Sequence, residues 1–251
     1  MKRRSGVGAE KKAGLARALS KMGICSRSDA AEKIRSGRVR VNGAVRRDIE
    51  TPVRMGRDKI EVDERGVAAK EFVYWMVNKP RGILTTAEDE EGRETVYSLL
   101  PKRVPWMGPV GRLDKASEGL LLLTNDTEWA ARITAPESHI EKKYAVQIGT
   151  VADEVLLAKL EAGVMDGGEL LRARSAKMVR AGEKNSWIEV VLHEGKNRQI
   201  RRILEGRGVE VLRLIRVAIG AVELGTLAKG AARELTRAEV EMLKRGRHFR
   251  G

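Results

Sequence analysis

The sequence predicts an α+β protein in which a small basic module precedes a larger mixed body. In the module, two short helical stretches lead into a strand and a hairpin turn at Asn42-Gly43. In the body, strand-like runs alternate with helical stretches. The strand-like runs cover residues 187–192 and 209–217, and the helical stretches cover residues 152–162, 197–205 and 236–244.

Length and composition indicate an ordinary globular protein. The chain has 251 residues, of which 42% are hydrophobic and 33% charged, enough for a substantial core. No apolar run approaches the roughly 20 residues that a membrane span needs. The basic start, residues 1–14, has no apolar segment typical of a secretory signal, so we expect a cytoplasmic protein without membrane contact.

Cysteine and histidine usage argues against a metal centre. Cys25 is the only cysteine, which excludes a disulfide framework and a cysteine-rich zinc site. His139, His193 and His248 have no recognisable metal-binding spacing. We therefore expect no metal.

Positive charge is concentrated at the front. Residues 1–60 contain 17 Lys and Arg against 6 Asp and Glu, whereas the remaining 191 residues contain 32 against 29. Such a front attracts phosphate without regard to sequence. A solvated basic tail is the alternative, and we assign residues 1–14 to it as disordered, but the charges that follow are part of periodic structure.

The order of signals in the module predicts helix, helix, strand and turn. Leu15, Leu19 and Met22 recur at helical spacing before Gly23, where the first helix ends. Ser26 is placed to cap a second helix, with Asp29 completing a capping box. Gly37 then ends this helix, and residues 38–41 alternate as a strand before the hairpin turn.

The segment LARALSKMGICSRSDAAEKIRSGRVRVNG closely resembles an S4 RNA-binding module. We assign residues 15–62 to this module and residues 63–70, a polar stretch with Gly66, to a linker. A basic helix pair that only maintains solubility is the alternative. The basic side chains expected to face an RNA backbone are Arg27, Lys33, Arg35, Arg38 and Arg40.

The body begins with a strand and a basic turn. Val73, Trp75 and Val77 alternate, and the strand ends in Asn-Lys-Pro-Arg-Gly, residues 78–82. Lys79 and Arg81 are expected to project from this turn toward RNA. A plain basic turn explains the same residues equally well.

A glycine-rich loop supplies the candidate nucleophile. In residues 108–119, GPVGRLDKASEG, Asp114 precedes the apolar run 120–123, so its carboxylate is expected near a sheet yet open to a cleft. An Asp in such a loop is more often a turn-former or a helix cap. Asn125 and Asp126 fit that simpler role, ahead of a helix at residues 128–133.

Three motifs together resemble the pseudouridine synthases, in the subfamily that modifies ribosomal RNA and carries a leading S4 module. GRLDKASEGLLLLTND looks like the catalytic motif, KKYAV at 142–146 like the tyrosine motif, and EGKNRQIRR at 194–202 like the third motif. The resemblance covers residues 15–241. It implies a largely antiparallel sheet with flanking helices and a central cleft, placed here at residues 71–245 before a basic tail at 246–251.

The resemblance implies a role for each catalytic side chain. Asp114 matches the essential nucleophile, which would add to the sugar or the base of a uridine flipped from its stack. Arg201 matches the position that keeps this carboxylate ionised. Tyr144 would lie against the base, its hydroxyl a candidate acceptor for the C5 proton. By spacing alone, Tyr144 suits a core position and Arg201 a solvated helix face.

These assignments predict an enzyme that isomerises a specific uridine in ribosomal RNA to pseudouridine without a cofactor. We expect 23S RNA rather than 16S RNA as substrate, free or in an assembly intermediate, and a monomer. A non-catalytic RNA-binding or assembly factor is the alternative, and a hydrolase releasing uracil is a third. Further residues expected to contact RNA in the body are Lys79, Arg81, Arg112, Lys196, Asn197, Arg198, Gln199 and Arg202.

Overall fold

The structure is a computed structural model that describes residues 12–68, 71–87 and 89–246, and these residues divide into two compact units. The first unit runs to Val73 and includes segments 105–108 and 125–127, and the second comprises the rest. None of the helices in the described part of the chain has the length and apolar character to span a bilayer. Most of the predicted tails, residues 1–14 and 246–251, lies outside the described residues.

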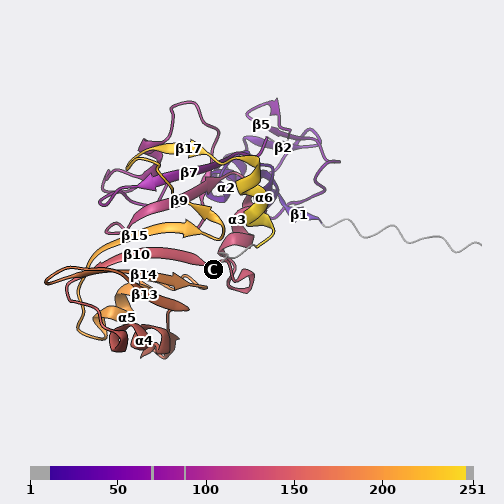
Figure 1. Cartoon of the computed structure of the whole chain (residues 1–251). Coiled ribbons are helices and arrows are strands. Elements are labelled where there is room, and N and C mark those ends of the chain that lie inside the picture. Colours follow the sequence, from indigo (N-terminus) through magenta and orange to yellow (C-terminus); the bar gives the residue numbers. More distant parts are fainter. Residues whose placement is uncertain (1–11, 69–70, 88, 247–251) are drawn as a thin grey trace, which may run out of the picture. The chain divides into compact units, whose positions relative to one another are not determined.

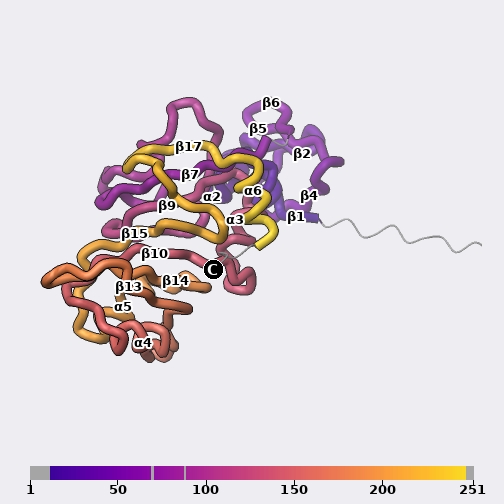
Figure 2. Tube along the Cα trace, in the orientation of Figure 1, coloured from indigo at the N-terminus to yellow at the C-terminus, as the bar shows by residue number. Residues whose placement is uncertain are grey.

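The described residues of the first unit form two helices and six short strands. Its sheets are β1–β4 and β3–β2–β5–β6, with antiparallel pairing throughout. Figure 2 shows these strands near the two helices. The elements are β1 (Ala13–Gly14), α1 (Leu15–Lys21), α2 (Arg27–Arg35), β2 (Val39–Val41), β3 (Ala44–Val45), β4 (Pro52–Val53), β5 (Ile60–Val62) and β6 (Arg65–Gly66).

Local signals in this unit act as the sequence predicts. The Ser26 side chain accepts from the Asp29 backbone, and Asp29 accepts in return from the Ser26 backbone, which forms the capping box of α2. At the hairpin, Asn42 and Gly43 have φ values of 52° and 81°, as a tight two-residue turn requires. Leu15, Leu19 and Ile34 anchor the small core.

The boundaries of this unit differ from the predicted ones. Ala13–Gly14, expected in the disordered tail, form β1 and pair with β4. The sheet also continues into the expected linker, because Arg65–Gly66 pairs with β5 as strand β6. A short strand with a tight turn carries little apolar periodicity, which explains why the sequence did not reveal it. Residues 69–70 of that linker lie outside the described part.

The second unit contains the remaining elements. They are β7 (Tyr74–Lys79), η1 (Val96–Leu99), β8 (Gly108–Pro109), β9 (Glu118–Thr124), α3 (Thr127–Thr134), η2 (Pro136–Ser138), β10 (Lys142–Ile148), α4 (Glu154–Ala162), β11 (Val164–Asp166), β12 (Glu169–Leu171), β13 (Ser175–Ala181), β14 (Ser186–Leu192), α5 (Gln199–Glu205), β15 (Val211–Ile219), β16 (Val222–Glu223), β17 (Ala232–Glu234) and α6 (Arg237–Lys244). Of these, β8 and the first residue of α3 fall at the edges of the first unit.

A mixed, largely antiparallel sheet forms the frame of this unit, as predicted. Its strand order is β13-β14-β10-β15-β9-β7-β17, which Figure 1 shows in succession. Every pair along this order is antiparallel except β15 with β9, which is parallel. The parallel pair joins the strand that follows the Asp114 loop to a strand almost 100 residues later in the chain.

Helices α3 and α6 cover part of this sheet. Trp129 and Ile133 of α3 and Val240 of α6 pack in one core with apolar side chains of β7 and β9. The Trp129 indole donates to the Val240 carbonyl at 3.4 Å. Thr236 and Glu239 form the predicted capping box at the start of α6. The packing therefore fixes one end of β9, the strand that follows the candidate nucleophile.

Two local predictions need correction. The helix expected at residues 197–205 begins at Gln199, because Arg198 takes a left-handed conformation with φ 49°. Asn125, expected to cap α3, instead accepts from the Val73 backbone and donates to the Glu71 carbonyl. In both cases a tertiary contact or a loop conformation overrides a local signal.

Candidate active site

A cavity of about 460 Å³ lies beside β10 and β15 in the second unit. Both Asp114, from the loop before β9, and Tyr144, from β10, line it. Asp114 is half-buried, whereas Tyr144 is only 8% exposed. The volume falls within the range of small-molecule sites, roughly 300–1,000 Å³. The structure thus brings two of the three predicted catalytic residues to one opening.

Lys79 fixes the loop that carries Asp114. Its ammonium donates to the carbonyls of Asp114 at 3.1 Å and Ser117 at 2.8 Å, and also to that of Pro80. Burial lowers the pKa of Lys79 to about 8, although the nearby carboxylates of Asp114 and Glu118 oppose this shift. The prediction that Lys79 projects toward RNA is wrong, because its side chain is fully buried among these carbonyls.

Gly119 allows β9 to approach β15 closely. Its φ is +100°, and a Cβ at this position would lie 2.9 Å from the Arg216 nitrogen and still closer to the Arg216 carbonyl oxygen. Only glycine fits such a backbone contact without strain. Gly119 pairs with Arg216 of β15, and Arg216 lies opposite Tyr144 of β10. The Asp114 loop is therefore next to β15.

Glu118 holds the start of β9 by ion pairs, one of them to Arg213 of β15. This carboxylate is 3% exposed and accepts from Arg213 at 3.0 Å and Lys229 at 2.6 Å. Burial would raise the pKa of Glu118, but the hydrogen bonds from these two cations hold it below its usual value. The carboxylate next to the catalytic loop is therefore a structural anchor.

Arg201 reaches the Asp114 loop from α5. Its guanidinium donates to the Ala116 carbonyl at 3.3 Å and to the Val211 carbonyl at 3.5 Å. Burial and the charge of Arg198 lower the pKa of Arg201, whereas the charge of Asp114 raises it. The charge of Asp114 thus reaches the Arg201 guanidinium, whose hydrogen bonds go to backbone carbonyls.

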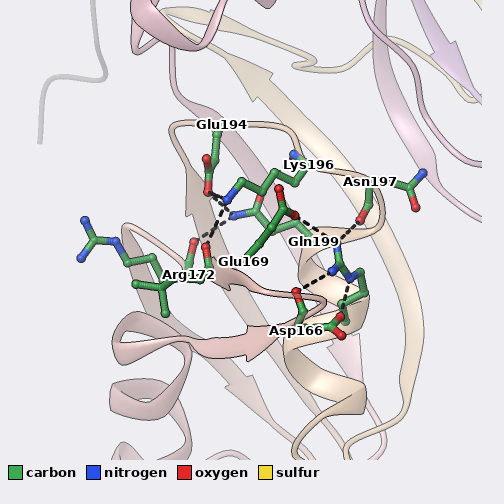
Figure 3. Close-up of polar contacts among 9 residues, drawn as sticks. Asp166, Glu169, Arg172, Glu194, Lys196, Asn197 and Gln199 are labelled. Carbon is green, nitrogen blue, oxygen red and sulfur yellow. Dashed lines mark hydrogen bonds and ion pairs between the residues drawn. The ribbon is translucent and has the colours of Figure 1, made fainter.

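The loop before α5 forms one wall of the cavity and is held by its own polar network (Figure 3). The Gln199 amide donates to the Arg172 carbonyl and to the Glu194 carboxylate, each at 3.1 Å, and its oxygen accepts from the Lys196 backbone. Gln199 is 2% exposed. These bonds hold Gln199 in place at the cavity, and its contact with RNA stays a prediction.

A second set of bonds ties α5 to the hairpin of β11 and β12. Arg202 is hydrogen-bonded to the carboxylate and the carbonyl of Asp166, and it also donates to the Asn197 carbonyl. Lys196 reaches the Leu170 carbonyl at 3.2 Å (Figure 3). The predicted RNA contacts Arg202 and Lys196 therefore have intramolecular partners that shape the wall.

Other predicted RNA contacts in this unit face solvent. Arg81, Arg112, Asn197 and Arg198 are exposed, and all but Arg81 line the cavity. A second hollow of about 480 Å³ shares Arg112, Asp114 and Asn197 with the first. Asp114 therefore lies where two openings meet. Within the described residues, no group of three or more His, Cys, Asp or Glu side chains could hold a metal ion.

Two buried cations at the cavity are absent from the predicted site. Lys142, 9% exposed, and Arg216, 5% exposed, line the cavity, and Arg216 lies opposite Tyr144 in the strand register. The sequence contained a signal for Arg216: it follows Leu214 by two residues in the expected strand 209–217, at an inward position. A charged side chain at an inward-facing position of a strand indicates a functional site.

The predicted RNA contacts of the first unit are on its surface. Arg27, Arg35 and Arg40 are exposed. Arg38 is hydrogen-bonded to Asp63, and Lys33 lies 3.6 Å from the same carboxylate. The hydrogen bond from Arg38 holds the pKa of Asp63 below its usual value despite an opposing effect of desolvation. Part of the basic surface is thus neutralised within the unit.

The pattern of the RNA pseudouridylate synthase family matches residues 73–206, which include Asp114, Tyr144 and Arg201. The chain belongs to this family. The S4 domain pattern matches residues 14–58, in agreement with the predicted module at 15–62. The family confirms that the protein is a pseudouridine synthase and an isomerase, against the alternative of a non-catalytic factor.

Individual relatives span nearly the whole synthase. The chain is 39% identical to "Ribosomal large subunit pseudouridine synthase B" of Bacillus subtilis, over 92% of this chain and 95% of that protein. It is 36% identical to an uncharacterized RNA pseudouridine synthase of Aquifex aeolicus, over 90% and 91%. A crystal structure of a pseudouridylate synthase superposes with a TM-score of 0.65 at 29% identity, over 92% of this chain and 99% of the other.

Proposed function

We propose that this synthase converts a specific uridine of large-subunit ribosomal RNA to pseudouridine, with Asp114 as nucleophile. The observation that supports this most directly is that Asp114 and Tyr144 line one cavity within the residues matched by the family. The substrate follows from the Bacillus subtilis relative, whose name states large-subunit ribosomal RNA. The enzyme would act as a monomer in the cytoplasm, on free RNA or on an assembly intermediate.

The chemistry requires a nucleophile, a proton acceptor and a way to hold the detached base. Asp114 would form a covalent bond to the uridine after this nucleotide flips out of its stack. Arg201 would supply positive charge near the carboxylate, and Lys79 would hold its loop through the Asp114 and Ser117 carbonyls. Tyr144 would contact the base and accept the C5 proton. No electron or group carrier takes part.

The S4 domain would bind the RNA backbone and so raise the concentration of the target near the cavity. Its exposed Arg27, Arg35 and Arg40 support this role, together with the excess of positive charge in residues 1–60. At the cavity rim, Arg112 and Arg198 are exposed and suited to phosphates close to the flipped nucleotide.

The test compares ribosomal RNA from cells with and without the gene, with pseudouridine mapped across both 23S and 16S RNA. One 23S position should lose its modification and regain it when purified wild-type protein is added without ATP or metal. Asp114→Asn should lower the rate by at least about 10³-fold.

Three outcomes would contradict the proposal. Pseudouridine formation by Asp114→Asn at the wild-type rate would remove Asp114 as nucleophile. A change confined to 16S RNA would overturn the substrate, and release of free uracil would indicate the hydrolase. Asp126→Asn is the matched control, because Asp126 is a buried carboxylate that does not line the cavity.

A further inference from the structure

Lys142 and Arg216 form a pair of buried cations at the catalytic cavity. They come from the neighbouring strands β10 and β15, and both line the cavity together with Asp114 and Tyr144. Arg216 also pairs with Gly119 in the parallel pair of β15 and β9. It therefore lies between β10, which carries Tyr144, and β9, which follows the Asp114 loop. We call these two side chains the cationic pair.

The hydrogen bonds of the cationic pair leave charge unsatisfied. The Lys142 ammonium donates to the His193 carbonyl at 3.4 Å, and the Arg216 Nε donates to the Leu120 carbonyl at 2.7 Å. The Arg216 Nη2 is buried and has no hydrogen-bond partner. Within the described chain, no carboxylate forms an ion pair with either residue. By contrast, Arg213 and Lys229 both pair with Glu118.

Such an arrangement costs folding free energy. A buried charge without a counter-ion is destabilising, and two like charges side by side add to that cost. The effect is visible in the pKa of Lys142, which burial and the charge of Arg216 lower to about 8. The pair therefore does not serve packing. It is suited to negative charge that arrives with the substrate.

We propose that Lys142 and Arg216 bind the carbonyl oxygens of the uracil ring and stabilise the negative charge that develops on it when its bond to the sugar breaks. This inference rests on the proposed function. Preorganised cations in a water-poor site are among the most effective ways to stabilise such charge. Their place next to Tyr144, the proposed contact of the base, puts them within reach of the same ring.

The step balances without a further reactant. When the C1′–N1 bond breaks, its electron pair stays with the base and is delocalised over N1 and the two carbonyl oxygens, while an Asp114 oxygen bonds to C1′. The base then turns, C5 bonds to C1′ and the Asp114–C1′ bond breaks. Finally, the C5 proton leaves and N1 gains a proton. If Asp114 adds to the ring first, negative charge again reaches a carbonyl oxygen.

A phosphate is the competing ligand for the cationic pair. The exposed Arg112 and Arg198 at the same cavity already provide cations for phosphates, and they are not buried. The buried pair is better placed for the part of the nucleotide that enters deepest. The experiment must therefore separate stabilisation of the base from binding of the backbone.

The test measures single-turnover rates of Lys142→Met and Arg216→Met at saturating enzyme and pH 7. The substrate is an RNA fragment that carries the mapped target as uridine or as 5-fluorouridine. Fluorine withdraws electrons and so stabilises the detached base by itself. Each variant should lose about 100-fold in rate on uridine. On 5-fluorouridine, the loss in rearranged product should be clearly smaller. Lys143→Met is the matched control, because Lys143 is the next residue on β10, does not line the cavity and pairs with Glu189.

Stability distinguishes this role from a structural one. Methionine removes an unpaired buried charge together with one hydrogen bond to a carbonyl, so neither variant should lower the melting temperature by more than about 4 °C. Lys142→Arg should keep most of the activity. Equal losses on both substrates, or a defect confined to RNA affinity, would overturn the proposal. Wild-type rates in both methionine variants would refute this inference. The proposed function would still stand if the wild type is active and Asp114→Asn is not. Should a methionine variant fail to fold, the pair would be structural and the proposal wrong.

Discussion

In the S4 domain, Arg27, Arg35 and Arg40 are exposed. In the larger unit, Lys142 and Arg216 are buried at the catalytic cavity, and Lys79 is buried against the Asp114 loop. Exposed charges are screened over about 8–10 Å and act together as a diffuse attraction for phosphate. Buried charges act on a few atoms, and each one matters. The total charge of the chain therefore predicts the diffuse attraction for phosphate, but it does not predict where single buried charges act.

The strongest test of the buried side concerns Gly119. Gly119→Ala should destabilise the protein by about 3 kcal/mol, because its Cβ would collide with the Arg216 backbone and its φ is unfavourable for alanine. Urea unfolding measures the loss. Gly82→Ala is the control, since Gly82 has φ +98° but open space around a Cβ. Equal losses in both variants would show that conformational strain alone, and not the close approach, decides.

Removal of the Lys79 ammonium should have the next largest effect. Lys79→Met leaves three carbonyls without their donor and should cost about 2 kcal/mol of stability. It should also lower activity by loosening the Asp114 loop. Arg81→Met, a change in the exposed neighbour on the same turn, should leave the melting temperature unchanged. If both variants unfold alike, Lys79 does not anchor the loop.

The catalytic rate should depend on pH through the charge of Lys142. The pKa of Lys142 is about 8, so its charge is lost as pH rises and the rate should fall about tenfold from pH 7 to pH 9. Lys142→Arg should make this fall clearly smaller, and Lys79, whose pKa is also about 8, accounts for the remainder. A variant profile that coincides with wild type would assign the titration to another group.

Folding stability, unlike the catalytic rate, should increase as pH rises through a neighbouring range. The pKa of Lys142 is about 8 in the folded chain and 10.5 when unperturbed, so between these values the unfolded chain binds more protons. Folding stability therefore gains a favourable contribution as pH rises from 8 to 10.5. Denaturation of wild type and Lys142→Met at several pH values measures it, and the contribution should be absent in the variant.

The smallest effect is expected on the exposed side. Arg35→Gln together with Arg40→Gln should weaken RNA binding a few-fold and reduce the salt slope by about 0.7–0.9 for each lost phosphate contact. The melting temperature should stay unchanged, because both side chains are exposed. Binding titrations at several salt concentrations provide the measurement. An unchanged slope would place the RNA on another surface.

Features that depend only on neighbours along the chain could be predicted from the residue pattern. The capping boxes at Ser26 and Thr236 and the turn at Asn42-Gly43 follow from local hydrogen bonding and backbone preferences, so they could be predicted. Asp114 and Tyr144 were found because their motifs resemble a family, and the structure then placed both at one cavity.

Contacts between distant segments establish which charged side chains are buried. Lys79 and Gln199 look like surface residues in sequence, yet their hydrogen bonds are made to carbonyls brought close by loops and by other strands. Arg216 becomes part of the site because β15 pairs with both β10 and β9. Burial and electrostatic environment depend on contacts between distant segments. The inward register of Arg216 indicates that it is buried, but the local residue pattern does not identify its partners.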